Sequence, residues 1–289
     1  MELAPFHLAV ARRVPLIHNI TNYVTVNDVA NILLAAGASP IMADEPQEAA
    51  EITSICDALV INIGTLNCQT IPAMQLAGAT ANKLGHPLVL DPVGAGASSL
   101  RTNTARELLE ALRFTVIRGN SSEIKTLFAG DGSTRGVDAS DLDAVGEQGL
   151  EALAEVARRF AARTGAVVAI TGVIDIVAGP DGRAFAVRNG HAMMARITGS
   201  GCMLSALVAA FVVANPEAAL EATLAAVATM GVAGELAYER VSGSTAGAGD
   251  GAAVATGGGT ASFRSALIDA IGQLDGAALD ARANVEELR

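Results

Sequence analysis

Short apolar runs alternate with longer amphipathic stretches along most of this chain. The runs are apolar at successive positions, which is typical of strands in a parallel sheet that helices cover on both faces. They predict strands over Val14–Ile20, Ser39–Ala43, Ala58–Gly64, Pro87–Gly94, Thr115–Asn120 and Ala166–Gly172. Between them apolar residues return at helical spacing, as at Val29, Ile32 and Leu33. The pattern predicts an α/β protein of three layers, αβα, with a mainly parallel central sheet.

The segment Ile174–Gly190 departs from this alternation. It contains two apolar runs joined by the turn Gly179–Gly182, which predicts an antiparallel hairpin at an edge of the sheet. The chain after the hairpin has a mostly helical pattern. Residues 242–259 are rich in Gly, Ala, Ser and Thr, and this composition favours a flexible loop over the alternative of a lid that contacts a nucleotide.

The amino-acid composition limits the class of protein, the number of domains and the kind of partner that we expect. The 289 residues are 51% hydrophobic and 17% charged, so the chain can bury a large core. No change in composition divides it, and we expect a single domain over residues 1–289. The net charge of −11 and the 3% aromatic content argue against a nucleic-acid partner, which needs a basic face. A few local donors can still hold an anionic substrate.

The cysteines and the N-terminal sequence indicate the cellular compartment in which the protein is expected to act. Cys56, Cys68 and Cys202 form no C-x-x-C pair, and an odd number suits a reducing environment. The first residues lack the order of a signal peptide. The apolar run Met203–Ala214 is about 12 residues long, whereas a membrane span needs ~20. We therefore expect a cytoplasmic protein with no membrane partner.

Polar residues and glycines follow the predicted strands. Ligands bind at the carboxyl ends of the strands in sheets of this kind. Those ends read His18–Asn19, Met42, Gly64, Asp91–Pro92, Arg118–Asn120 and Thr171–Gly172. Strand ends are rich in turn residues in any protein, but this mixture of Asp, Arg, Asn and Thr also suits a polar ligand.

A glycine-rich turn at Gly199, Ser200 and Gly201 precedes Cys202 and the apolar helix that follows. The unpaired N–H groups at a helix start, with the positive end of the helix dipole, form an anion hole. The turn is not a Walker A loop, because no Gly-Lys-Ser/Thr follows. A thiol at a helix start has a lowered pKa, so Cys202 can serve as a base. Taken alone, the segment also fits Cys202 as a small buried apolar residue.

Two acidic segments are candidates for a metal site. Asn120 and Glu123 have the spacing of a capping box, while Glu123 at the sheet edge also suits a metal that holds phosphates. Asp91 either begins an Asp-Pro turn or presents its carboxylate to the same metal. Arg118 can contact phosphate. The four histidines show no zinc-ligand spacing, so we expect no transition metal.

Several segments together resemble one family. They are Pro15–Asp44, Leu59–Asn67, Leu90–Ser98, Ile117–Ile124, Arg135–Ala139, Ile170–Gly172 and Ile197–Phe211. In this combination and order the chain resembles the hydroxyethylthiazole kinases, which act in thiamine biosynthesis and salvage and have the ribokinase-like fold. Ser200 stands where the family often has Thr.

The resemblance implies ATP-dependent phosphorylation of the hydroxyl of 4-methyl-5-(2-hydroxyethyl)thiazole with Mg²⁺. Cys202 would take the place of the Asp base of related sugar kinases. The other implied roles are thiazole contact by Met42 and Gly199 with Asn19 beside them, ATP contact by Arg118 and Thr171, and Mg²⁺ binding by Asp91 and Glu123. The resemblance also implies a homotrimer with active sites between subunits.

Other activities fit the same fold. A hydroxymethylpyrimidine kinase or another small-alcohol kinase is the nearest alternative. An ATP-dependent hydro-lyase that acts on hydrated NAD(P)H is an alternative from another class, and it would release phosphate. A binding protein without catalysis is disfavoured, because Asp91, Glu123 and the segment Thr198–Cys202 are all present.

Overall fold

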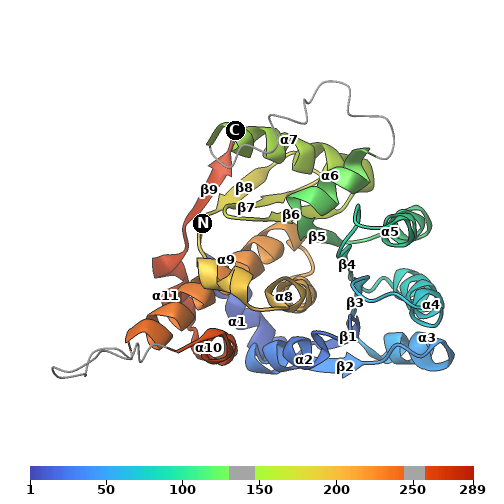
Figure 1. Ribbon diagram of the computed structural model, residues 1–289, viewed down its shortest axis with the longest axis horizontal. Coiled ribbons are helices and arrows are strands. Elements are labelled where there is room, and N and C mark those ends of the chain that lie inside the picture. Colours follow the sequence, from blue (N-terminus) through green and yellow to red (C-terminus); the bar gives the residue numbers. More distant parts are fainter. Residues whose placement is uncertain (130–146, 244–257) are drawn as a thin grey trace.

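The computed structural model describes residues 1–129, 147–243 and 258–289. Its strands form one sheet in the order β2-β1-β3-β4-β5-β6-β7-β8-β9 (Figure 1). The strands are β1 (Leu16–Ile20), β2 (Ser39–Met42), β3 (Ala58–Asn62), β4 (Leu88–Asp91), β5 (Val116–Asn120), β6 (Val167–Thr171), β7 (Asp175–Ala178), β8 (Ala184–Val187) and β9 (Val285–Leu288).

The predicted parallel strands are confirmed. Strands β1 to β6 run parallel, so their carboxyl ends meet at one edge of the sheet. The register places Asn19 beside Met42 and Asn62 beside Asp91. The sheet therefore brings together residues that are far apart in the sequence.

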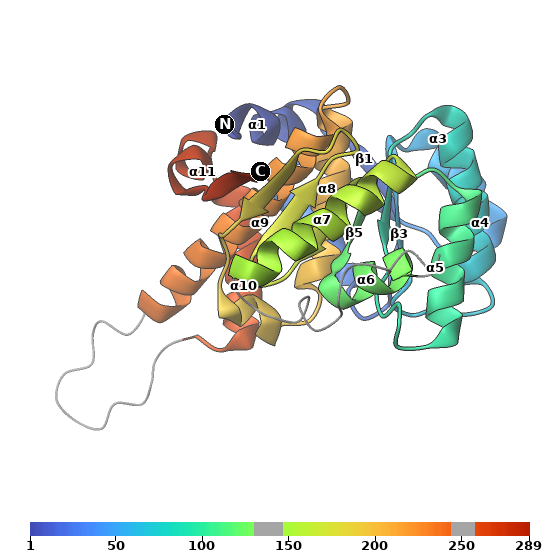
Figure 2. The same ribbon diagram turned by 90° about the horizontal axis from the view of Figure 1, so that it is seen from above.

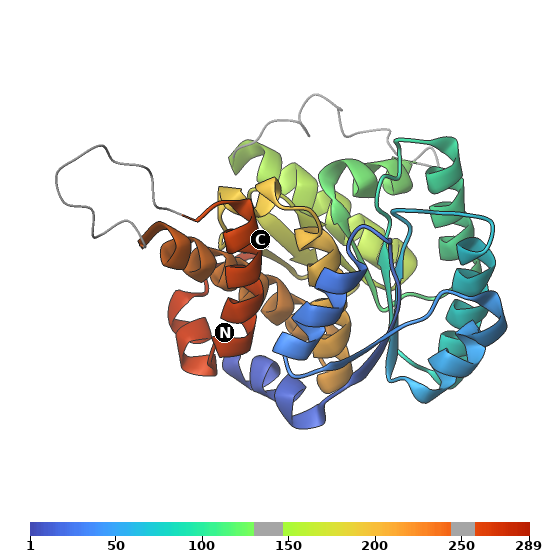
Figure 3. The ribbon, with the colours of Figure 1, turned by 60° about the horizontal axis from the view of Figure 1, so that its bottom comes forward.

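Helices cover both faces of this sheet (Figures 1 and 2). They are α1 (Ala4–Arg13), α2 (Val26–Ala35), α3 (Pro46–Ile55), α4 (Thr70–Leu84), α5 (Ser99–Ala111), α6 (Ser121–Ala129), α7 (Glu147–Thr164), η1 (Ala192–Arg196), α8 (Ser200–Ala214), α9 (Ala219–Ser242), α10 (Thr260–Gln273) and α11 (Gly276–Arg282). Helices α3 to α7 pack on one face. Helices α1, α2 and α8 to α11 pack on the other, and α2 lies beside α8 (Figure 3). The predicted three-layer α/β fold is confirmed.

Alternation along each strand divides the core into two clusters. On β3, Val60 packs toward α8, and Leu59 and Ile61 pack toward α4. Because side chains alternate with period two, Asn62 lies on the same face as Val60. The same rule places Asp91 with Val89, so both polar residues face the layer that contains α8.

The expected hairpin is present, but it does not form the edge. Strands β7 and β8 pair antiparallel through the predicted turn, and β9 then pairs antiparallel with β8 on the outer side. The sequence of β9, Val-Glu-Glu-Leu, has no apolar alternation that would predict a strand. Pairing with β8 at the end of the chain forms this strand.

Helix α9 is long and apolar enough to span a membrane by length and composition alone. In its most apolar window, however, 78% of the residues are buried within the protein. This is typical of the central helix of a packed core.

Two sequence expectations lie outside the part of the chain that the structure describes. They concern most of the glycine-rich segment 242–259 and the resembling segment Arg135–Ala139.

Gly231 of α9 generates a stability prediction. A Cβ atom there would lie 2.9 Å from both the carbonyl carbon and the carbonyl oxygen of Asn189, which are backbone atoms that cannot rotate away. Gly231→Ala is therefore expected to destabilise the protein by about 1–3 kcal/mol, although alanine favours helix. Thermal unfolding measures the effect. Gly243→Ala is the matched control, because a Cβ there meets none of the described residues within 4 Å. Equal melting temperatures for both variants would contradict this packing.

Candidate active site

The first turn of α8 forms a backbone cradle at the edge of the sheet. Gly199 caps the helix with a φ of 88°. The helical ladder begins with the N–H of Met203, which donates to the carbonyl of Gly199 (2.8 Å). The N–H groups of Ser200, Gly201 and Cys202 precede that bond, and first-turn N–H groups have no partner within their helix. The helix thus begins at Ser200, earlier than the sequence indicated. This geometry suits the predicted anion hole, which stays a prediction.

Glycine at two positions of the turn permits close approach by neighbouring elements. A Cβ at Gly199 would lie 2.8 Å from Thr25 Cγ2. A Cβ at Gly201 would lie 2.5 Å from Arg118 Nη1. The Arg118 guanidinium therefore lies directly against the backbone of the cradle.

Arg118 connects three neighbouring strands. Its Nη2 donates to Thr171 Oγ1 on β6 (2.5 Å), and its Nη1 lies 3.6 Å from Asp91 Oδ1 on β4. The side chain is only 10% exposed. The structure thus brings together Arg118 and Thr171, the two residues predicted to contact ATP.

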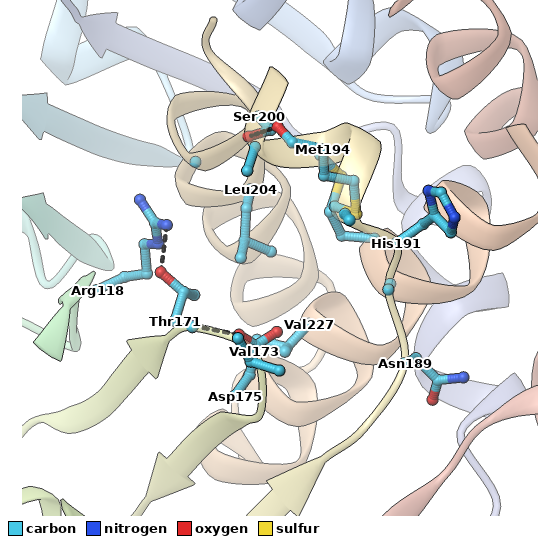
Figure 4. Close-up of a pocket in the computed structure, with 17 residues that line it drawn as sticks. Arg118, Thr171, Val173, Asp175, Asn189, His191, Met194, Ser200, Leu204 and Val227 are labelled. Carbon is cyan, nitrogen blue, oxygen red and sulfur yellow. Dashed lines mark hydrogen bonds between the residues drawn. The ribbon is translucent and has the colours of Figure 1, made fainter. Parts of the chain in front are cut away.

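A cavity of about 530 Å³ begins at this cradle (Figure 4). Arg118, Thr171, Ser200 and Gly201 line its polar end, and Leu204, Val227 and Met230 belong to its apolar wall. Asp175 also lines it and accepts a hydrogen bond from the N–H of Gly172 (2.8 Å). Burial raises the pKa of Asp175 to about 6, against the opposing effects of that bond and of Arg118.

Asp91 ends β4 at the predicted edge and is completely buried. Its Oδ2 accepts hydrogen bonds from Asn62 Nδ2 and Ser205 Oγ, each 2.8 Å long. Its Oδ1 has no hydrogen-bond partner among the described residues. Burial raises the pKa of Asp91, and this is the largest effect on it. The charge of Arg118 and the hydrogen bonds from Ser205 and Asn62 lower this pKa, whereas the charge of Glu123 raises it further.

Glu123 forms the capping box that its spacing predicted. Its N–H donates to Asn120 Oδ1 (2.9 Å), and its Oε2 accepts from the N–H of Asn120 (2.8 Å). Its Oε1 accepts from the N–H of Gly94 (2.8 Å). Glu123 also acts electrostatically on Asp91. The capping interpretation is confirmed, and the metal role of Glu123 stays a prediction.

Cys202 lies in the first turn of α8 with its sulfur among polar groups. Asn22 Nδ2 and Asn62 Nδ2 each donate to its Sγ at 3.2 Å. Burial raises the pKa of the thiol, and the Asp91 charge raises it further. The hydrogen bonds act in the opposite direction but do not reverse the shift. The expectation of a lowered pKa is therefore wrong in direction, because burial and the charge of Asp91 raise the pKa by more than the hydrogen bonds lower it.

Met42 and Asn19 lie together on the far side of β3 from Asp91. They are register partners at the ends of β2 and β1. Asn19 Nδ2 donates to the carbonyl of Ile17 (2.9 Å), whereas its buried Oδ1 has no partner among the described residues. His18 Nε2 bonds the carbonyl of Ala43 (2.8 Å), which fixes the chain next to Met42.

Sequence reasoning assigned no role to Asn62, Ser205 and Asp175. Asn62 is the polar residue that ends the apolar run of β3, and this was a usable signal. Ser205 is a single hydroxyl within an apolar helix, and Asp175 begins a strand after a turn. Only the fold shows that Ser205 contacts Asp91 and that Asp175 lines the cavity.

Known proteins resemble this chain over nearly its whole length. Residues 8–276 match the sequence model of the hydroxyethylthiazole kinase family. The hydroxyethylthiazole kinase of Clostridium acetobutylicum is 56% identical over 272 residues, with 94% of each chain covered. That of Desulfovibrio desulfuricans is 52% identical over 280 residues, covering 97% of this chain and 96% of the relative.

Solved structures agree with these matches. The hydroxyethylthiazole kinase protein of Pyrococcus horikoshii superposes with a TM-score of 0.83 at 38% identity, with 99% of each chain covered. A ribokinase-like superfamily protein from Enterococcus faecalis, 13% identical with a TM-score of 0.59, covers 90% of this chain and 88% of its own, and shares the fold. The chain belongs to the hydroxyethylthiazole kinase family.

Proposed function

We propose that this protein transfers the γ-phosphoryl group of ATP to the hydroxyl of 4-methyl-5-(2-hydroxyethyl)thiazole, a step of thiamine biosynthesis and salvage. The observation that carries the proposal is the backbone cradle beside Cys202, with Arg118 against Gly201. A helix start with a flanking guanidinium suits a phosphoryl group that carries several negative charges. The names of the relatives supply the alcohol and the class of reaction.

ATP would occupy the cavity that begins at the cradle. The polar end of the cavity, at Arg118 and Thr171, suits the phosphates of ATP. Its apolar wall at Leu204 and Val227 suits the adenine ring. The thiazole would lie on the opposite side of Cys202, near Met42, Asn19 and Gly199. The two substrates would then meet at the first turn of α8.

Mg²⁺ would be held by Asp91, and Glu123 would lie farther from the ion and act on it through its charge. The buried Oδ1 of Asp91 accepts no hydrogen bond from the described residues and lies 3.6 Å from Arg118 Nη1, so it fits a cation ligand. Both oxygens of Glu123 already accept backbone N–H bonds. No group of three His, Cys, Asp or Glu that could hold a metal occurs among the described residues. A sparse carboxylate set suits Mg²⁺, which keeps waters and binds phosphate oxygens. When bound, Mg²⁺ neutralises charge on the phosphates.

The phosphoryl transfer would proceed in line. The substrate hydroxyl gives its proton to the Cys202 thiolate while its oxygen forms a bond to the γ-phosphorus. The bond from that phosphorus to the bridging oxygen breaks, and its electron pair leaves with ADP. The N–H groups of Ser200, Gly201 and Cys202 receive the transferred group. Such transition states are loose, so positioning and electrostatics matter more than a strong base.

The protein would act as a cytoplasmic homotrimer with its sites between subunits. Apolar side chains are exposed along α2 and in the segment before it, with Tyr23 80%, Val24 53% and Leu34 58% exposed. Tyr23 and Val24 precede Thr25, which contacts Gly199. Exposed apolar side chains in these positions suit contact with a partner subunit.

The reaction product tests the function directly. Incubation with Mg-ATP and hydroxyethylthiazole is expected to give ADP and the phosphorylated alcohol in equal amounts, which mass spectrometry detects. Hydroxymethylpyrimidine is the control alcohol. Faster phosphorylation of the pyrimidine would favour the other kinase, and free phosphate formed with hydrated NAD(P)H would favour the hydro-lyase.

Substitutions of Cys202 test its role as base. Because the thiol pKa is raised, the thiolate fraction, and with it kcat, is expected to increase with pH between about 7 and 9. Cys202→Ala should lower kcat about tenfold or more and remove this rise. Cys202→Asp, whose carboxyl has an ordinary pKa far below that of a thiol, should keep or raise kcat at pH ~7 and make kcat depend less on pH. An unchanged rate in Cys202→Ala would exclude the base role while leaving the kinase assignment in place.

The trimer is tested by light scattering of the purified chain, which is expected to give three times the mass of the subunit. Leu34→Glu should shift the mass to that of one chain and lower activity, because it places a charge within the proposed interface. Leu84→Glu is the control, because Leu84 at the end of α4 is 47% exposed, against 58% for Leu34. A single-chain mass for the unmodified protein would contradict the proposal.

A further inference from the structure

The sulfur of Cys202 is the acceptor for a pair of buried side-chain amides. Asn22 follows β1 and Asn62 ends β3, and both nitrogens lie 3.2 Å from Sγ. The two asparagines are 5% and 2% exposed. Two separate elements thus present donors to one sulfur atom.

The orientation of the Asn62 amide follows from its other partners. The N–H of Gly64 lies 2.9 Å from Asn62 Oδ1, and a backbone N–H can only donate, so the oxygen must face it. The nitrogen therefore faces Asp91 Oδ2 and Cys202 Sγ, and each of its two hydrogens has an acceptor.

The orientation of the Asn22 amide follows in turn. Its Nδ2 donates to Asn62 Oδ1 (3.1 Å) as well as to Cys202 Sγ. Neither amide offers an oxygen to the sulfur, so a thiol proton on Cys202 must point away from both. This arrangement suits a sulfur that accepts hydrogen bonds, and it suits the thiolate better than the thiol.

Charged groups surround this arrangement on several elements. Asp91 on β4 raises the pKa of the thiol, and Arg118 on β5 lies against Gly201. Asp28 on α2 lies beside Gly199, with Arg264 of α10 3.7 Å from it. Glu123 on α6 acts on Asp91. Burial and Asp91 raise the pKa of Cys202, whereas side-chain hydrogen bonds with Thr25, Asn22 and Asn62 lower it.

We propose that Asn22 and Asn62 are positioning residues, which hold the side chain at position 202 as a hydrogen-bond acceptor, ready to take the proton of the substrate hydroxyl. Asn62 has a second task, because the same amide nitrogen holds Asp91 Oδ2 and so fixes the carboxylate relative to the sulfur. This inference rests on the proposed function for its catalytic part. The hydrogen-bond assignment itself is independent of the reaction.

The network allows its two arms to be separated by substitution. Asn22→Ala removes a donor to the sulfur and no hydrogen bond to Asp91. Ser205→Ala removes a donor to Asp91 and none to the sulfur. Asn62→Leu removes both donors at similar volume. If Asn62→Leu fails to fold, Asn22→Ala and Ser205→Ala still form a matched pair.

The readout is the rate of alkylation of Cys202 by iodoacetamide at a series of pH values, followed in the full-length protein by peptide mass spectrometry. Only the thiolate reacts, so the profile reports how strongly the protein stabilises it. Exposed Cys68 is the internal control for reagent and pH. Thermal unfolding checks that each variant is folded.

The midpoint is the pH at which the alkylation rate of Cys202 is half its maximum. We expect it to rise by about one pH unit in Asn22→Ala, since a hydrogen bond to a charged acceptor is lost. Ser205→Ala should leave the midpoint unchanged, because it removes no donor to the sulfur. An unmoved midpoint in Asn22→Ala, or an equal rise in both variants, overturns the inference.

Activity separates this inference from the proposed function. In Asn22→Ala, kcat should fall with little change in the KM for ATP, whereas the same substitution in a Cys202→Ala background should cost little more. A shifted midpoint in a protein that makes no phosphorylated alcohol overturns the catalytic role and the proposed function together. Product formation with an unmoved midpoint overturns the amide pair alone.

Discussion

The close approach between the first turn of α8 and the ends of the central strands is the constraint on which the site depends. Glycine at 199 and 201 lets Thr25 and the Arg118 guanidinium reach the helix backbone, where any side chain would separate them. Because the turn is held this closely, its first-turn N–H groups, the Cys202 sulfur and Arg118 share one small region. A phosphoryl group placed there would meet fixed dipoles that need no rearrangement.

The parallel sheet supplies the other half of the site. Its period of two directs Asn62 and Asp91 toward α8, and the register of β3 and β4 makes them neighbours. The same geometry places Asn19 beside Met42 farther along the edge.

The sequence could predict the fold because runs such as Ala58–Ile61 are apolar at every position, and the sheet buries all of them. It could also predict the strand-end residues, since the edge at which they meet follows from parallel topology. It could not predict β9, which depends on pairing with β8, nor the contact of Ser205 with Asp91. The direction of the Cys202 pKa shift was also beyond it, because burial and the nearness of Asp91 are properties of the folded protein.

The central claim is that the cradle at the start of α8 receives the transferred phosphoryl group. A crystal structure with Mg²⁺ and a non-hydrolysable ATP analogue tests it most directly. We expect the γ-phosphoryl oxygens within about 2.7–3.2 Å of the N–H groups of Ser200, Gly201 and Cys202, with the base in the adjoining cavity. A γ-phosphoryl group bound elsewhere, out of reach of those N–H groups while the nucleotide is fully ordered, would contradict the account.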